Sequence, residues 1–273
     1  MSVSRTTRLR HVDCWPSYGL SRQLPPDPEL RFAKATLAIT ELYSRHLALG
    51  PPLVCTEWWT RFIDPLGLLP PEYPLRAESG LNGADLAAAL MAMPDMRRRQ
   101  ATLDLVQYLL VGWVTAGGWD TSPLQTAYDA CVTDGLLLVL TSKAKTSPDR
   151  KLSAHVTYTI DGNGDGRSTL HVLDRTGRAV FESEPQESRC EARVFPDLAR
   201  SLRWEGSNTV RFDPWSMITR RRFFVDEGRQ SEMECLADPP ITVDNLGYGA
   251  EPPGMIDWIA ESGLVTPNEG RHF

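Results

Sequence analysis

Apolar and polar residues alternate most regularly over residues 153–184, and this alternation predicts a three-stranded antiparallel meander. The apolar positions of the first strand are Val156, Tyr158 and Ile160. Leu170 and Val172 continue the pattern in a second strand. Residues 174–177 read Asp-Arg-Thr-Gly, a tight turn with glycine where a positive φ is needed, before a third strand. One face of the meander is expected in a core and the other toward water.

Before residue 142 the apolar positions follow the helical period of 3.6 instead. The first helix is predicted to begin at Asp27-Pro28, with aspartate as N-cap and proline at the first helical position, and to end at Gly50. Further helices are predicted over residues 84–91, 96–114 and 122–131.

Residues 136–141, LLLVLT, form a short uninterrupted apolar run that predicts a central strand covered on both faces. A chain that changes from helices to strands predicts an α+β fold, with a helical N-terminal half packed on a mainly antiparallel C-terminal sheet. The expected division is a helical region 1–142 ending in that buried strand, a linker 143–152, and a β region 153–273 with a short C-terminal helix.

The remaining segments give weaker patterns. Residues 1–28 end in LPPDP and are expected to form an arm across the surface. The stretch from Cys55 is expected to be a short helix or turn followed by a proline-rich loop. Later segments are predicted as follows: a strand over 190–195, a helix over 196–204, strands over 209–212 and 217–225, and a helix over 255–261.

Two runs of arginine fall within predicted elements. Arg97 to Arg99 lie near a helix start, where the helix dipole disfavours cations, and are expected to be solvated unless paired. Arg220 to Arg222 lie in a strand, where they are expected to protect an exposed edge by charge.

The formal net charge of −6 disfavours general binding to a nucleic-acid backbone, which needs clustered lysine and arginine, and favours a basic partner. The N-terminus carries positive charge without a following apolar segment, and no apolar run is long enough to cross a bilayer. We therefore expect no membrane association and a cytoplasmic location.

The cysteines are scattered and form no CxxC pair, which favours reduced thiols in or near the core over zinc ligands. They are Cys14, Cys55, Cys131, Cys190 and Cys235. Cys14 has His11 and Asp13 as sequence neighbours, although neighbours on a strand point apart.

The segment Asp161 to Gly166, DGNGDG, resembles the first half of a calcium-binding loop of the EF-hand or dockerin kind. The ligand set would be Asp161, Asn163, Asp165 and Thr169. The pattern then departs from the family, because Val172 stands where a bidentate acid is required and the flanking segments are strands. A plain hairpin loop is the alternative, and no other cofactor is expected.

The sequence contains none of the motifs GxGxxG, GxxxxGK[ST], HExxH or GxSxG, so nucleotide-binding, zinc-protease and hydrolase-elbow functions have no motif support. His155 and His171 are expected to be neighbours in the meander. A dispersed enzyme site would draw on Cys14, His155, His171 and Asp174.

Trp58, Trp59 and Phe62 form an aromatic cluster that either caps a core or anchors a partner. Acidic charge, aromatic anchors and the missing motifs together favour a cytoplasmic protein-binding module, such as an immunity protein of bacterial type that neutralises a cognate toxin. The alternatives are an enzyme with a dispersed His/Cys/Asp site and a calcium-stabilised structural protein.

Overall fold

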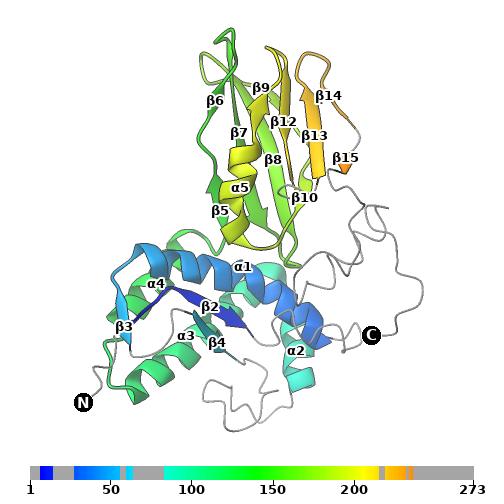
Figure 1. Ribbon diagram of the computed structural model, residues 1–273. Helices are drawn as coiled ribbons and strands as arrows, with labels where there is room; N and C mark the ends of the chain where they lie inside the picture. Colours follow the sequence, from blue (N-terminus) through cyan, green and yellow to red (C-terminus); the bar gives the residue numbers. More distant parts are fainter. Residues whose placement is uncertain are drawn as a thin grey trace, which may run out of the picture. The chain divides into compact units, whose positions relative to one another are not determined.

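The computed structural model describes residues 7–14, 28–55, 60–63, 83–214, 219–231 and 234–235. The chain divides into two compact units: unit 1 is Met1–Leu138 with Asp161–Gly164, and unit 2 is Val139–Ile160 with Asp165–Phe273. Helices are mostly in the N-terminal half and antiparallel sheets in the C-terminal half (Figure 1). The predicted α+β class is confirmed.

Unit 1 contains four helices and four short strands in its described residues. They are β1 (Thr7–Leu9), β2 (His11–Cys14), α1 (Pro28–Leu49), β3 (Leu53–Cys55), β4 (Thr60–Ile63), α2 (Gly83–Met91), α3 (Asp95–Ala116) and α4 (Ser122–Thr133). The helices agree closely with the predicted ranges, because long amphipathic periods and proline starts are strong local signals.

Helix α1 packs against the other three helices and against β2. Its buried side chains include Ala35, Ile39, Leu42, Tyr43 and Leu47. The fully buried Tyr43 hydroxyl lies 2.7 Å from Gln107 Oε1 of α3 and 3.2 Å from the Leu124 carbonyl oxygen of α4. Burial raises the pKa of Tyr43, so the phenol stays a proton donor that joins three helices.

The predicted surface arm is wrong for residues 7–14. Strand β1 pairs antiparallel with β3, and β2 pairs parallel with β4. Leu9 and Val12 are buried, and the Val12 amide donates to Ser44 Oγ of α1 over 2.9 Å. Residues 60–63 are likewise a strand and not the expected helix or turn. Strands of three or four residues carry too little periodicity to reveal partners far away in sequence.

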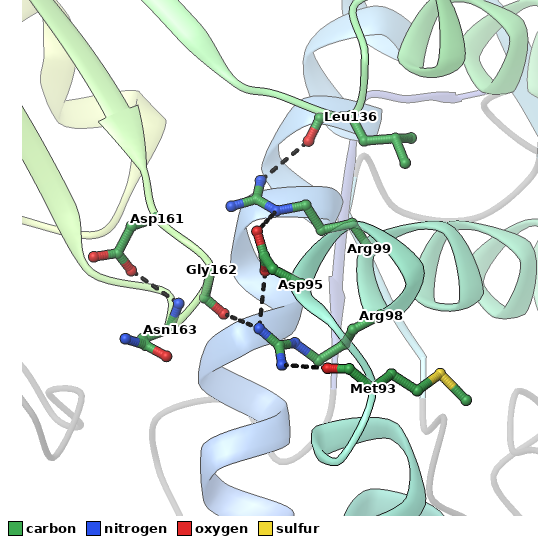
Figure 2. A network of polar contacts seen from close by, with 8 residues as sticks. All are labelled: Met93, Asp95, Arg98, Arg99, Leu136, Asp161, Gly162 and Asn163. Atoms are coloured by element: carbon green, nitrogen blue, oxygen red, sulfur yellow. Dashed lines mark hydrogen bonds and ion pairs between the residues drawn. The ribbon is translucent and has the colours of Figure 1, made fainter.

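Two of the three arginines at the start of α3, Arg98 and Arg99, are paired and not solvated, as Figure 2 shows. The Asp95 carboxylate accepts from Arg98 Nη2 over 2.8 Å and from Arg99 Nε over 2.9 Å. These side chains are only 11% and 5% exposed. Arg97 alone of the three is exposed. Asp95 thus neutralises two cations and also lies at the favourable end of the helix dipole.

The same two guanidinium groups bind carbonyls of two loops (Figure 2). Arg99 Nη1 donates to the Leu136 oxygen over 3.0 Å, and Arg98 Nη2 to the Gly162 oxygen over 3.0 Å. A Cβ at position 162 would lie 2.2 Å from Asp95 Oδ1, so only glycine permits this close approach. Asp95, Arg98 and Arg99 therefore hold both loops to α3.

The predicted central strand over residues 136–141 is wrong. Leu136 adopts φ 61° and its amide donates to the Cys131 oxygen, so it belongs to the C-terminal end of α4. Only β5 (Val139–Thr141) is a strand, and it lies at an edge of its sheet. Leu137 and Val139 are 47% and 51% exposed. An apolar run does not by itself show that both of its faces are covered.

Unit 2 contains β5 and the following elements of the described chain: β6 (Lys145–Thr146), β7 (Leu152–Ile160), β8 (Gly166–Asp174), β9 (Ala179–Glu182), β10 (Gln186–Ser188), the 3₁₀ turn η1 (Ala192–Val194), α5 (Phe195–Ser201), β11 (Arg203–Trp204), β12 (Thr209–Phe212), β13 (Thr219–Phe224), β14 (Arg229–Gln230) and β15 (Glu234–Cys235). The meander β7–β8–β9 is confirmed, including the turn with Gly177 at φ 83°.

The strands form two antiparallel sheets. One has the order β10-β8-β7-β5, with β6 also on β7 and β9 also on β8. The other has the order β11-β12-β13-β14, with β15 also on β13. Phe181 of the first sheet contacts Phe223 of the second at 6.2 Å between ring centroids, and Phe223 stacks on Phe212 at 5.1 Å. The two apolar faces therefore share one core.

Two strand predictions in unit 2 are corrected by the pairing. Residues 190–195 contain η1 and the start of α5 in place of a strand. Strand β13 is not an exposed edge, because it pairs with β12 on one side and with β14 and β15 on the other. Arg211 and Arg222 face each other in register, and both bind Glu205, at 3.0 and 2.8 Å. Shared pairing relieves the repulsion that like charges would otherwise cause.

Removal of the Asp95 carboxylate is expected to destabilise the protein. Asp95→Ala leaves two poorly exposed guanidinium groups without their anion, and we expect the free energy of unfolding to fall by about 2 kcal/mol in urea titration. Asp129→Ala is the control, because Asp129 is exposed and its described bond is to Gln125 Nε2. A loss within about 0.5 kcal/mol is expected there. Equal losses in both variants would contradict the role assigned to Asp95.

Candidate functional site

Helix α4 and the part of α3 that follows Arg99 contain no lysine or arginine. Residues 100–142 contain Asp104, Asp120, Asp129 and Asp134 and no lysine or arginine. The aspartates are exposed, and Tyr108 beside them on α3 is 72% exposed. We call Asp104, Tyr108, Tyr128 and Asp129 the acidic surface.

Hydrogen bonds hold the carboxylates of the acidic surface in place. Asp104 Oδ1 accepts from Tyr128 Oη over 2.7 Å and from Gln100 Nε2 over 2.8 Å, and Gln100 also reaches Tyr128. The bond to Asp104, together with burial, raises the pKa of Tyr128, so its hydroxyl stays a donor. Asp129 accepts from Gln125 over 2.8 Å. These bonds join α3 to α4 and fix two negative charges on an ordered face.

A second polar cluster lies on the outer face of the meander. Residues of β7 alternate between buried and half-buried, and the half-buried ones include His155, Thr157 and Thr159. His155 lies opposite His171 in register, and their rings stack with centroids 4.9 Å apart. The predicted proximity of the two histidines is confirmed.

His171 is bonded through both ring nitrogens. Its Nδ1 lies 3.2 Å from Glu182 Oε2 of β9, and its Nε2 lies 2.9 Å from Thr157 Oγ1 of β7. Burial, and next the neighbouring His171 ring, lower the pKa of His155. The cluster therefore has one imidazole fixed by hydrogen bonds and a second that resists protonation.

Asp174, another of the proposed catalytic residues, does not join this cluster. The Asp174 carboxylate closes the β8–β9 turn, where it accepts from Thr176 Oγ1 over 2.6 Å and from the Thr176 and Arg178 amides. The Thr176 hydroxyl bond lowers the pKa of Asp174. Cys14 ends β2 in unit 1, and its side chain lies outside the described residues.

The calcium-like segment forms the β7–β8 hairpin loop. The Asp161 carboxylate accepts from the Asn163 amide over 2.9 Å, and the Asp161 carbonyl accepts from the Gly164 amide over 3.0 Å. Arg98 donates a hydrogen bond to the Gly162 carbonyl. Asp165 Oδ2 lies 3.8 Å from Arg167 Nη2. These contacts account for the loop as a hairpin turn. Calcium binding by Asp161, Asn163, Asp165 and Thr169 stays a prediction.

Two further observations bear on metals and membranes within the described ranges. No group of three or more His, Cys, Asp or Glu side chains there is arranged to hold a metal ion. Nor does any helix in this part of the chain combine the length and apolarity that crossing a membrane requires.

Most of the aromatic cluster lies outside the residues that the structure describes. Trp58 and Trp59 fall outside the described residues, as does the predicted helix over 255–261. Phe62 lies in β4 opposite Asp13 in register, and its side chain is not described. Their role as partner anchors stays a prediction.

Sequence reasoning missed the acidic surface, Thr157 and Glu182. The surface had a legible signal, since 100–142 lacks any basic residue. Nothing in the sequence indicated Thr157 or Glu182, because their contacts with His171 depend on the register across three strands.

No protein-family model matches this sequence, and neither a curated protein nor a solved structure matches it.

The lowered pKa of His155 predicts a pH dependence of stability. A histidine whose pKa is lower in the folded than in the unfolded chain binds fewer protons when folded. Its contribution to stability is therefore full above the ordinary histidine pKa of about 6.5 and is lost as the pH falls below it. The groups facing it across the strands are His171 and, beyond, Glu182.

We expect the free energy of unfolding to fall less between pH 8 and pH 5.5 in His155→Asn than in the unmodified protein, by urea titration at each pH. Thr159→Val, on the same face of β7, should keep the original pH profile. A His155→Asn profile parallel to that of the unmodified protein would remove this assignment.

Proposed function

We propose that the protein is a binding module for a basic protein, which it engages through the acidic surface of α3 and α4. The observation that carries the proposal is the stretch from residue 100 to 142, which supplies α4 and the part of α3 after its three arginines and has four aspartates without a single lysine or arginine. A negatively charged surface attracts a cationic partner and accelerates its association.

The composition of this surface also supports binding beyond long-range attraction. Exposed tyrosines are frequent anchors of interfaces, because one side chain offers large apolar area with a polar tip. Tyr108 is 72% exposed and lies one helical turn after Asp104. The bonds of Gln100 and Tyr128 to Asp104 order the carboxylate before binding, which lowers the entropic cost of association.

An immunity-type role, in which the chain neutralises a basic toxin, is the form of this function that we propose. Binding alone is sufficient for neutralisation, so the role needs no catalytic group. We further propose the cytoplasm as its compartment, supported by Cys55, Cys131 and Cys190, which are reduced thiols in the described part of the chain.

Charge reversal on the acidic surface tests the binding role. The tagged chain is used to capture partners from its native host, and a basic protein in stoichiometric amount is expected. Asp104→Lys with Asp129→Lys should then weaken binding at least tenfold in titration calorimetry, and Tyr108→Ala about tenfold. Affinity of the unmodified chain should fall with added salt.

The control is Asp197→Lys with Asp226→Lys, which makes the same change in net charge at exposed positions of unit 2. This pair should bind normally. Equal losses in both double variants, or full binding by Asp104→Lys with Asp129→Lys, would reject the acidic surface as the interface. Co-expression with the captured protein tests neutralisation: the chain should restore growth, and the double variant on α3 and α4 should not.

A further inference from the structure

A hydroxyl, an imidazole and a carboxylate form one chain of hydrogen bonds across three strands of the meander. Thr157 of β7 bonds to His171 of β8, and His171 bonds to Glu182 of β9. All three lie on the outer face, where the side chain of His171 is 22% exposed and that of Glu182 is 64% exposed. Small molecules in solvent can therefore reach the chain of bonds.

For a neutral His171, the chemistry of the partners fixes the direction of both hydrogen bonds. An ionised carboxylate only accepts hydrogen bonds, so His171 Nδ1 must donate its proton to Glu182. In a neutral imidazole Nε2 is then the acceptor, and the Thr157 hydroxyl must donate to it. This is the arrangement in which a histidine serves as the base for a hydroxyl nucleophile and a carboxylate holds its tautomer.

Further polar residues surround the chain of hydrogen bonds. The His155 ring stacks on the His171 ring, with centroids 4.9 Å apart. Thr169 lies opposite Thr157 in register, and Arg167 lies opposite Thr159. Thr169 therefore adds a second hydroxyl beside Thr157, while the Arg167 guanidinium is paired with Glu187 over 3.0 Å.

We propose that this cluster is a hydrolytic site for small carboxylic esters, with Thr157 as nucleophile, His171 as general base and Glu182 as the residue that positions His171. Thr157 Oγ1 attacks the ester carbonyl carbon while its proton passes to His171 Nε2. The bond to the alcohol oxygen then breaks, and the alcohol leaves with that proton. His171 next takes a proton from water, which attacks the acyl-threonine; the acid is released and the Thr157 hydroxyl is restored.

This site uses residues of unit 2 and is independent of the binding role proposed for α3 and α4. Its substrates are small because the three groups lie on a sheet face, where Thr157 and His171 are half-buried among neighbouring side chains. The reaction consumes water and an ester alone, so it needs no oxidant, reductant or bound ion.

Hydrolysis of p-nitrophenyl acetate by the full chain tests the proposal. We expect a burst of nitrophenolate and an acetyl group on the peptide that contains Thr157, detected by mass spectrometry after acid quench. Thr157→Val should abolish both the burst and the adduct. His171→Gln should lower kcat/KM by about 100-fold, the usual contribution of a general base. Thr159→Val is the matched control, since it makes the same change two residues along the same face, and it should keep full activity.

Glu182→Gln separates positioning from mere structure. Glutamine keeps the shape of the side chain but lacks the negative charge that stabilises the imidazolium formed when His171 takes the proton, so kcat should fall with little change in KM. Glu182→Asp should restore part of the rate. Far-ultraviolet circular dichroism and melting of each variant report folding. An adduct on any residue other than Thr157, or a rate that Thr157→Val and Thr159→Val leave equal, would overturn the proposal.

Discussion

The nine-residue register between β7 and β8 is the constraint on which unit 2 depends. A slip of β7 by one residue would exchange its two faces relative to β8, and it would expose Val156 and Tyr158. Burial of each such side chain contributes about 1.5–3 kcal/mol, whereas a polar cross-strand pair contributes about 0.2–1 kcal/mol. The apolar face therefore decides the register, and the stacking of His155 on His171 follows from it.

In unit 1 a comparable constraint comes from charge. A guanidinium group with little access to water is costly unless an anion and acceptors satisfy it. Arg99 meets this condition through Asp95 and the Leu136 carbonyl, which belongs to a residue in a strained left-handed conformation. Because the Arg99 guanidinium needs the Leu136 carbonyl as an acceptor, it fixes the conformation of the chain where α4 ends. Arg98 likewise fixes the hairpin loop by donating a hydrogen bond to the Gly162 carbonyl.

The periodicity of apolar residues in the sequence predicted the helices α1 and α3 and the strands β7 and β8, because this periodicity largely determines them. It also predicted that His155 lies close to His171. It failed where the partner is remote. The β8–β9 pairing contains a bulge between Val172 and Leu173. Regular continuation of the Leu173–Ala179 pair would place Phe181 opposite His171; the bulge places Glu182 there and turns Phe181 toward Phe223. No composition rule gives the position of such a bulge, so Glu182 was not predictable.

The hydroxyl, imidazole and carboxylate of the meander lie at positions that packing of the core does not constrain. The fold requires alternate positions of β7 and β8 to be apolar, but it places no such requirement on the outer face. Any β-forming residue at Thr157, His171 or Glu182 would change stability by less than about 1 kcal/mol. A directed chain of three hydrogen bonding groups is thus not needed for folding. Its presence on positions that the core leaves free is what favours a chemical role over a structural one.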